Sequence, residues 1–426
     1  MENILILAYY YAPCRGVAAY RPSSWAKDFQ KHNFKTTTIT RQWEGNENVW
    51  TDYQKELDWD IKIVNENNSK TIYLPYRKNK YLMLSEKKWM RLLGFNKLIH
   101  LFLTITGNFQ PEVDAYACFK EYLFKHLQNE KYKVIIVTSP PLNILKLAVA
   151  VNKEFKIPFI VDFQDSWNNL MLSENYNPCR KEKFYNSMKL WYLQKWLSKV
   201  SFIITVTPSI ADLIEKVTEK PVRIITNGFE KEKYTTTPVK ATNSYFNISL
   251  MGTVHPIQDI TMMLKGLNLF LNGKDPELVR VNFIGLNSVP ESSRKVKAAL
   301  PDKFVYISDR VSMDESVEMT LAANILLFPC YKGYKDYYTA KIFEYLGAGR
   351  NILMVPGNND IVDDLILRTG TGKIANSEEE FAAILEKWYI EWKSTGSVEY
   401  RGLRENIDFY SRENQNDLFC DLIKKM

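Results

Sequence analysis

Short apolar runs recur along the whole chain and alternate with longer segments of mixed polarity. In the first half, the runs that we expect to form strands are Ile4–Ala8, Thr36–Thr40, Thr71–Leu74, Val134–Thr138, Phe159–Phe163, Phe202–Val206 and Val222–Thr226. In the second half they are Phe246–Met251, Val281–Ile284, Phe304–Ile307, Ile325–Phe328, Ile352–Val355 and Gly372–Ala375. Short apolar strands separated by helical segments are typical of parallel sheets covered by helices. The pattern predicts an α/β protein with two successive Rossmann-like domains.

The segment between the two halves is polar. Residues 230–244 are rich in lysine and threonine and contain Pro238, a composition typical of a connection. A chain of 426 residues also exceeds what one hydrophobic core usually supports. We therefore expect a first domain over residues 1–229 and a second over residues 230–405.

Composition and charge limit the classes of ligand, and the cellular compartment, that we expect for this protein. The formal charge of +7 is modest and dispersed, which favours anionic ligands or an anionic membrane face over nucleic acid. The five cysteines form no CxxC pair, and an acidic residue, Glu2, stands where a signal peptide needs positive charge. No window offers about 18 uncharged apolar residues. These features predict a cytoplasmic protein with reduced thiols.

The most informative segment runs from Lys335 to Gly357, between two predicted strands. It places Asp336, Thr339, Lys341 and Glu344 around the start of a short predicted helix. Open α/β sheets bind ligands at the carboxyl ends of their strands, where this helix begins. Free N–H groups at a helix start and a nearby lysine favour phosphate, and a carboxylate can accept hydrogen bonds from sugar hydroxyls. The alternative is an ordinary amphipathic helix with solvated charges.

This segment resembles the donor-binding segment of retaining glycosyltransferases of family four, which have the GT-B fold. Their signature is a glutamate, seven residues and a second glutamate before a glycine turn; here Asp336 replaces the first, Glu344 is the second, and Gly347 and Gly349 follow. The resemblance implies two Rossmann-like domains facing across a cleft. It implies a nucleotide-diphosphate sugar, UDP-linked, as donor, with no further cofactor and no metal. It also implies a final helix, about residues 406–426, that packs on the first domain.

The loop after the first predicted strand is a second candidate site. It contains Pro13, Arg15 and Gly16, ahead of a helix expected to start near Ser23. It has neither a GxGxxG fingerprint nor a phosphate-binding P-loop. The glycine lets the backbone approach a diphosphate, and Arg15 or Arg21 can supply charge. The loop resembles the amino-terminal loop of the same enzymes, and the alternative is a simple strand-to-helix turn.

A third candidate follows the predicted strand Phe159–Phe163. Asp162 and Asp165 lack further ligands at metal-binding spacing, so we expect a metal-free role rather than Mg²⁺ binding. In the enzymes that this chain resembles, this loop faces the acceptor. The resemblance thus implies that Asp162, Asp165 and Trp167 bind the acceptor, with Asp165 orienting or deprotonating the attacking hydroxyl. Asp165 as a helix N-cap is the alternative.

A fourth candidate is the turn after the predicted strand Phe246–Met251, with Gly252, Thr253 and His255. Many relatives of the resembled family carry a basic pair here that holds the donor diphosphate. In this chain His255 is the only such residue, and a lone histidine after a strand is usually a surface residue. We therefore expect Arg310, Lys341 and backbone amides to carry the diphosphate.

Two functions of different class fit these sites. The first is a retaining hexosyltransferase that extends a lipid-linked bacterial surface glycan, such as capsule or lipopolysaccharide, with Asp165, Asp336 and Lys341 as catalytic residues. The second is a nucleotide-sugar or glycan-binding protein of the same fold with little turnover.

The segment Lys87–Leu103 interleaves basic and apolar residues. On a helix its apolar residues fall broadly on one side, apart from Lys87, Lys88 and Arg91; they are Trp89, Leu92, Leu93, Ile99 and Leu103. Such a helix is typical of peripheral contact with the inner face of a membrane. Packing on the protein's own sheet is the alternative.

Overall fold

The computed structural model describes residues 1–45, 47, 52–57, 60–77, 95–109, 115–167, 177–235, 244–254, 258–331, 333–334 and 336–426. The chain forms two compact units: Met1–Thr226 together with Asn416–Met426, and Asn227–Gln415. The polar segment predicts the passage at residue 230, and the family resemblance implies the return near residue 406. In the structure the chain enters the second unit at Asn227 and returns only at Asn416.

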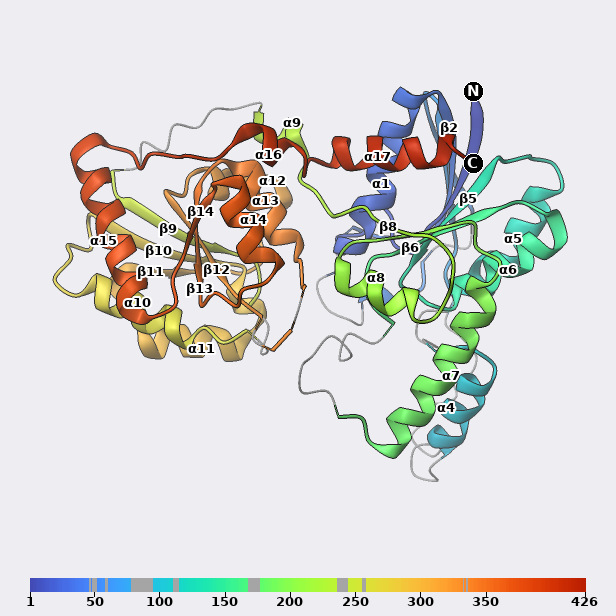
Figure 1. Ribbon diagram of the computed structural model, residues 1–426, viewed down its shortest axis with the longest axis horizontal. Helices are drawn as coiled ribbons and strands as arrows, with labels where there is room; N and C mark the ends of the chain where they lie inside the picture. Colours follow the sequence, from blue (N-terminus) through green and yellow to red (C-terminus); the bar gives the residue numbers. More distant parts are fainter. Residues whose placement is uncertain are drawn as a thin grey trace. The chain divides into compact units, whose positions relative to one another are not determined.

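The first unit contains a sheet with strand order β3-β4-β2-β1-β5-β6-β7-β8, in which only β3 is antiparallel to its neighbour (Figure 1). The strands are β1 (Glu2–Leu7), β2 (Phe34–Arg41), β3 (Lys62–Glu66), β4 (Ser69–Leu74), β5 (Val134–Ser139), β6 (Phe159–Phe163), β7 (Ile203–Thr205) and β8 (Val222–Ile224). The seven strands predicted for this half are confirmed, with small changes at their ends. The sequence pattern misses β3, because all five of its residues are exposed and it has no buried face.

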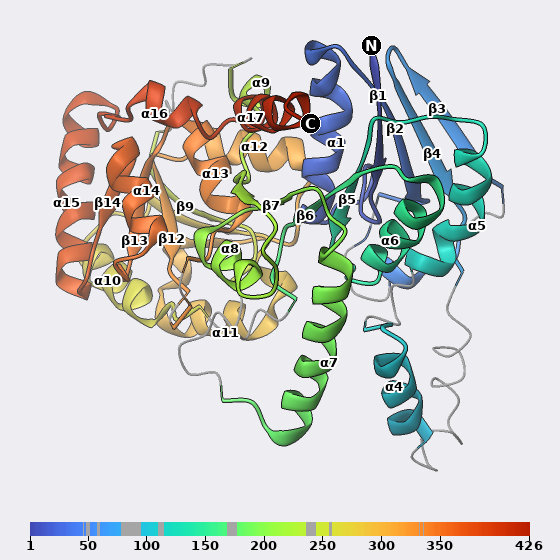
Figure 2. The ribbon, with the colours of Figure 1, turned by 45° about the vertical axis from the view of Figure 1, so that its right-hand side comes forward.

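Helices cover both faces of this sheet. The first unit contains α1 (Tyr20–Asp28), α4 (Phe95–Ile105), α5 (Ala115–Leu127), α6 (Ile144–Phe155), α7 (Arg180–Leu197), α8 (Pro208–Glu215) and most of α17 (Arg412–Lys424). Helices α1 and α17 pack together on one face, where Trp25 and Phe29 meet Phe419. Helices α5 and α6 lie on the other face, and α4 and α7 extend side by side away from the sheet (Figure 2).

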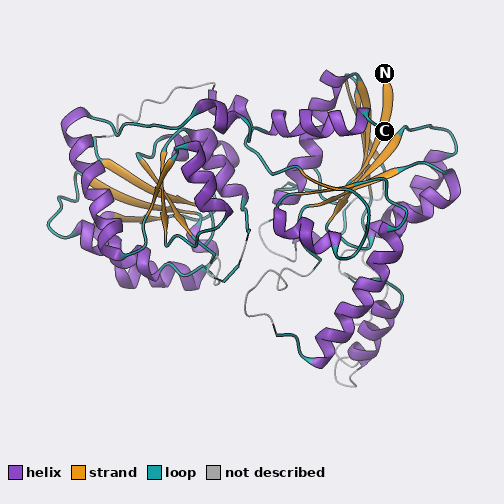
Figure 3. Cartoon of the chain, in the orientation of Figure 1, coloured by secondary structure: helices purple, strands orange, loops and turns teal. Residues whose placement is uncertain are grey.

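The second unit contains a fully parallel sheet with strand order β11-β10-β9-β12-β13-β14, and the two sheets are seen in Figure 3. Its strands are β9 (Phe246–Met251), β10 (Val279–Ile284), β11 (Val305–Ile307), β12 (Ile325–Pro329), β13 (Asn351–Val355) and β14 (Gly372–Ile374). All six agree with the prediction to within two residues. The regular alternation of apolar runs therefore predicts the sheet of this unit well.

Two cores sandwich the second sheet. On one face, Ile248, Leu250 and their neighbours pack against α10 (Thr261–Leu271), α11 (Pro290–Ala299) and α15 (Glu378–Thr395). On the other face, Leu326 and Phe328 pack against α12 (Met313–Leu321), α13 (Ala340–Ala348) and α14 (Ile361–Thr369). The short helices α9 (Lys231–Thr235) and α16 (Arg404–Asp408) complete the unit. No helix among the described residues has the length and apolar character needed to cross a membrane.

Candidate functional site

The second sheet reverses its strand order between β9 and β12, and this is where open α/β sheets bind ligands. The two strands pair only at their beginnings, where Ile248 and Ser249 lie opposite Ile325 and Leu326. Beyond that point the hydroxyl of Tyr345 joins them: it accepts from the Met251 N–H at 2.9 Å and donates to the Leu327 carbonyl at 3.3 Å. Helix α13, which carries Tyr345, is thereby fixed over the carboxyl ends of both strands.

Lys341, in the first turn of α13, meets the turn that follows β9. Its Nζ donates to the Thr253 carbonyl at 3.2 Å. Gly252 has a φ of +76°, and the position that a Cβ would take there lies 3.7 Å from Lys341 Cε. Gly285, at φ +84°, brings the turn after β10 close in the same way, since a Cβ on it would lie 3.6 Å from Gly252 Cα and 3.9 Å from Arg310 Cα. The turns after β9 and β10 and the backbone of Arg310 thus lie close together, and Lys341 contacts the first of these turns.

The amino terminus of α13 presents unused hydrogen-bonding groups beside that lysine. Thr339 is the N-cap residue, but its side chain makes no capping bond. Its buried hydroxyl has no hydrogen-bond partner among the residues that the structure describes. Uncapped N–H groups at a helix start carry partial positive charge and bind anions. Lys341 and this helix start together form a cationic site suited to phosphate.

The environment of Lys341 disfavours its charge. Part of the side chain reaches solvent, but protein atoms surround the ammonium group, and this loss of hydration lowers the pKa of Lys341 to about 8. Among the described residues, no carboxylate forms an ion pair with it. A bound phosphate group would supply the missing negative charge, so this site favours an anionic ligand.

Asp336 lies in the loop before α13, with the left-handed φ of +50°. Its N–H donates to Asp360 Oδ2 at 2.6 Å, and Asp360 also caps α14 through the Ile361 N–H. Burial and a hydrogen bond with the Asp336 side chain raise the pKa of Asp360 to about 6. Asp336 is therefore held against a second carboxyl group, which fixes the loop that leads into α13.

Both oxygens of Glu344 already accept hydrogen bonds from side chains of the same unit. Arg412 donates to Oε1 at 2.8 Å and Tyr234 to Oε2 at 2.6 Å, and a second nitrogen of Arg412 bonds to Glu230 at 2.6 Å. Burial, first of all, and the carboxylate of Glu344 raise the pKa of Tyr234. A ribose bound to Glu344 must share the carboxylate with these groups.

Two further residues, Arg310 and His255, are predicted for this site. Arg310 is exposed, and its backbone lies beside Gly285. His255 lies outside the described residues. The structure thus brings Gly252, Thr253, Thr339 and Lys341 together with the backbone of Arg310. The sequence reasoning missed Tyr234, Asp360 and Arg412, because these residues come from distant segments and belong to no local motif.

In the first unit, the loop after β1 runs through Pro13, Arg15 and Gly16 into a short 3-10 helix and α1, which begins at Tyr20 rather than near Ser23. The Gly16 N–H donates to the Cys14 sulfur at 3.4 Å, and the Arg15 N–H to Glu47 at 3.4 Å. The Arg15 side chain is exposed and has no hydrogen-bond partner in the described part of the chain. The loop is thus held through its backbone N–H groups, which bond to the side chains of Cys14 and Glu47.

The predicted phosphate ligand Arg21 is instead buried against Asp162. Its Nη2 lies 2.9 Å from Asp162 Oδ1, and its Nη1 donates to the carbonyls of Ile225 and Thr226 at 2.8 Å each. The exposed fraction of the Asp162 side chain is 0%. Arg21 therefore links β6 to the segment after β8 through these hydrogen bonds. Asp162 fits a positioning role better than contact with an acceptor.

Asp165 and Trp167 lie at the carboxyl end of β6 and line a pocket of about 80 Å³ with Ser139, Phe109 and Lys189. Although part of Asp165 reaches solvent, surrounding protein atoms raise the pKa of its carboxyl to about 6. Burial likewise lowers the pKa of Lys189. Lys189 enters from α7, so the local sequence gave no signal for it. Among the described residues, no cluster of three or more candidate metal ligands occurs.

Comparison with known proteins agrees with this architecture. The model of Glycosyltransferase Family 4 matches residues 88–233, about a third of the chain. No curated protein sequence matches. Among solved structures, sucrose-phosphate synthase from Thermosynechococcus elongatus is 12% identical with a TM-score of 0.64, covering 100% of this chain and 99% of its own. Anabaena HepE, solved with UDP and glucose, is 11% identical with a TM-score of 0.63 and full coverage of both chains.

A trehalose-phosphate synthase from Burkholderia vietnamiensis is also similar, at 11% identity and a TM-score of 0.60, covering 100% of this chain and 99% of its own. These likenesses extend over the full chain, and they show the fold. The chain has the GT-B fold, with two Rossmann-like domains.

Proposed function

We propose that this protein is a glycosyltransferase that moves a sugar from a nucleotide-diphosphate donor to a hydroxyl group. The observation that carries the proposal is the meeting of Lys341, the uncapped start of α13 and the Gly252–Thr253 turn at the point where the second sheet reverses its order. The GT-B fold, the match to Glycosyltransferase Family 4 and the UDP bound by HepE support it. UDP is accordingly the nucleotide that we propose.

In the proposed reaction, the sugar–phosphate bond breaks and negative charge grows on the departing diphosphate. Lys341 and the N–H groups of α13 stabilise that charge in a site of reduced hydration, where such groups act strongly. Arg310 adds charge from the neighbouring turn, and Arg15 and Gly16 are proposed to approach the same diphosphate. Transfer with retention of configuration is part of the proposal, and NMR of the product's anomeric proton tests it.

Asp165 is proposed to accept a hydrogen bond from the attacking hydroxyl, with the Trp167 ring beneath the acceptor sugar. Its raised pKa suits a group that takes up a proton near neutral pH. Asp162 holds Arg21 and through it the base of this loop. Asp336 is proposed to act from the loop before α13, where its contact with Asp360 sets its orientation.

The test is a transfer and donor-hydrolysis assay with a panel of UDP-sugars, comparing the wild type with Lys341→Met. Removing one preorganised charge from the diphosphate site should lower kcat by on the order of 100-fold. Lys387→Met, a lysine-to-methionine change at an exposed position of α15, is the control and should leave kcat unchanged. Equal kcat values for Lys341→Met and wild type would refute the assignment.

The alternative, a binding protein with little turnover, rests on Glu344. Because Arg412 and Tyr234 occupy both of its oxygens, the carboxylate that should hold the donor ribose already has partners. UDP binding by calorimetry without release of sugar from any UDP-sugar in the panel would favour this alternative.

We further propose that the acceptor is linked to a lipid and that the protein contacts a membrane. Helices α4 and α7 support this proposal. Of the predicted apolar stripe, Trp89, Leu92 and Leu93 lie outside the described residues, whereas Leu103 is only 3% exposed and packs inward. Other apolar side chains of α4 face solvent instead, and two more do so on α7: Leu98, Leu101, Phe102, Ile105, Phe184 and Trp191. Exposed apolar groups of this number are typical of an interaction surface.

The charge around these helices supports an anionic membrane as the partner that we propose. Exposed basic residues flank the apolar ones, namely Lys97, Arg180, Lys181, Lys183 and Lys195. Apolar side chains rimmed by cations favour the headgroup layer of an anionic membrane. Flotation with vesicles containing phosphatidylglycerol should carry the wild type upward at low salt, and Phe102→Ser/Trp191→Ser should stay below. Flotation of both proteins alike, or of neither, contradicts this form of the proposal.

A further inference from the structure

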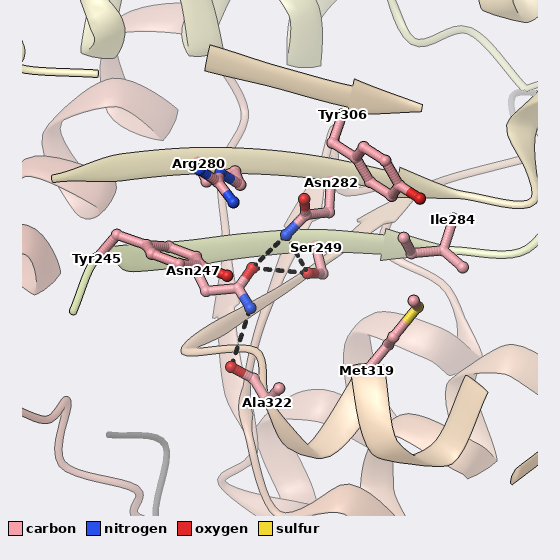
Figure 4. Close-up of a pocket in the computed structure, with 9 residues that line it drawn as sticks. All are labelled: Tyr245, Asn247, Ser249, Arg280, Asn282, Ile284, Tyr306, Met319 and Ala322. Carbon is pink, nitrogen blue, oxygen red and sulfur yellow. Dashed lines mark hydrogen bonds between the residues drawn. The ribbon is translucent and has the colours of Figure 1, made fainter. Parts of the chain in front are cut away.

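A pocket of about 260 Å³ opens on one face of the second sheet, beside strands β9, β10 and β11 (Figure 4). Its rim carries Tyr245, Arg280, Tyr306 and Met319, and its floor is formed by side chains of β9 and β10. We call it the polar pocket. Its lining runs from the beginnings of β9 and β10 to Ile284, the residue before Gly285. The polar pocket shares no lining residue with the phosphate site.

The pocket exists because one helix leaves part of the sheet uncovered. On this face, α12 returns from the edge strand β11 to β12 and packs over β9, where the Ala322 carbonyl accepts from Asn247 Nδ2 at 3.0 Å. On the same face, Ile284 at the end of β10 packs in one core with α12, whereas Arg280 of β10 and Tyr306 of β11 are exposed, Tyr306 by 49%. A sheet in this position is usually covered by helices on both faces.

Polar residues replace apolar ones on the floor of the pocket. Asn247, Ser249 and Asn282 are 4%, 1% and 9% exposed, although they lie on central strands. Ser249 Oγ donates to Asn247 Oδ1 at 2.9 Å, and Asn282 Nδ2 donates to the same oxygen at 2.6 Å. Buried polar groups destabilise a fold unless they are hydrogen-bonded. This network satisfies most of them and holds the Asn282 amide in one orientation.

Three groups that point into the pocket remain without hydrogen bonds to the described residues. Because Asn282 Nδ2 faces the network, Asn282 Oδ1 is left as a free acceptor, as Figure 4 shows. The Arg280 guanidinium only stacks on Tyr245, 4.5 Å from the ring centre, so its N–H donors are free. The Tyr306 hydroxyl completes the set. Donors and acceptors thus stand beside two aromatic rings and the apolar side chains of Ile284 and Met319.

We infer that the polar pocket binds one sugar ring of a glycan. A sugar presents hydroxyls that donate and accept, together with an apolar C–H face, and this pocket offers the matching groups. Its volume lies just below the roughly 300–1,000 Å³ of pockets for drug-sized ligands, so it suits a single ring better than a nucleotide. The open rim at Tyr306 leaves room for a longer chain to continue into solvent. Binding here requires no turnover, so the inference does not depend on the proposed activity.

Saturation-transfer NMR on the full-length protein tests the inference with three probes: methyl β-glucoside, methyl β-galactoside and methyl β-glucuronide. At least one should receive saturation from the wild type, and the signal should persist in excess UDP. Arg280→Ala/Tyr306→Ala should reduce that signal at least fivefold, and Tyr306→Phe should keep most of it. Arg294→Ala, an exposed change on α11, is the control and should have no effect.

Three results would overturn the inference: no transfer to any probe, loss of transfer when UDP is added, or an undiminished signal in the double variant. Since Arg280 and Tyr306 are exposed, the double variant should keep the wild-type melting temperature, which shows that a lost signal is not a folding failure. Activity assays of the Lys341 variant address a different site, so either proposal can fail alone.

Discussion

Two charged residues at the carboxyl ends of the two sheets have opposite surroundings. In the first unit, Asp162 is fully buried and paired with Arg21, whose Nη1 bonds to two backbone carbonyls. In the second unit, Lys341 is largely enclosed, and the Thr253 carbonyl is its only hydrogen-bond partner among the residues that the structure describes. A buried charge with a full set of partners holds a fold together, whereas an enclosed charge without a counter-ion is available to a ligand.

The largest effect should come from breaking the buried ion pair between Arg21 and Asp162. Arg21→Met leaves Asp162 buried without a counter-charge, which should lower the free energy of unfolding by about 3–5 kcal/mol. Urea denaturation of the full chain measures this. Adding Asp162→Leu to the same protein should recover much of the loss, because the buried charge is then gone. A single variant as stable as the wild type would show that the pair contributes little.

The next largest effect concerns Glu344, which lies on the same helix as Lys341 but has side-chain partners. If Glu344 holds the ribose, Glu344→Ala should weaken UDP binding by about 2–3 kcal/mol, the range for a hydrogen bond to a charged group. Arg412→Met is the matched control, because it removes the partner of Glu344 but not the carboxylate. Calorimetry on both variants decides: equal losses of affinity mean that Glu344 acts only through its ion pair.

The pH dependence of activity should report Lys341 together with Asp165, which lies three residues after Asp162 in the first unit. Asp165, with a pKa of about 6, is protonated in acid, and Lys341, with a pKa of about 8, is neutral in alkali. The profile of kcat/KM should therefore be a bell that falls below about pH 6 and above about pH 8. Asp165→Asn should abolish the acid limb, and Lys341→Arg should move the alkaline limb upward.

Stability gives a check on Asp165 that does not require activity. Its raised pKa means that the folded state holds this proton more tightly than the unfolded chain between about pH 4 and pH 6. The stability that it contributes is thus present in acid and is lost as the pH rises through 6. Asp165→Asn should be at least as stable as the wild type at pH 7, by thermal unfolding.

The smallest effect should be that of chelation. Asp162 is fully buried and bound to Arg21, so it cannot join Asp165 in holding a metal ion. Lys341 and the helix start are proposed to neutralise the diphosphate instead. Transfer activity should remain within about twofold of its starting value in EDTA. A complete loss of activity that Mg²⁺ restores would show that a metal ion, and not Lys341 with the start of α13, neutralises the diphosphate.

The sequence by itself determined the two sheets, because buried parallel strands need apolar runs whatever surrounds them. It also located Lys341 beside the Gly252 turn, since the carboxyl ends of neighbouring parallel strands meet at one edge. It missed β3, which has no buried face, and it offered Arg21 as a phosphate ligand although that residue is enclosed in the first unit.

Only the tertiary structure decided which charges have partners. Arg412 lies 68 residues from Glu344, and Asp162 lies 141 residues from Arg21, so no local pattern joins them. The polar floor at Asn247, Ser249 and Asn282 was equally hidden, because it depends on where α12 leaves the sheet uncovered. Periodicity along the chain fixes which residues share a face of a strand or helix, but burial and pairing depend on the elements that pack against that face.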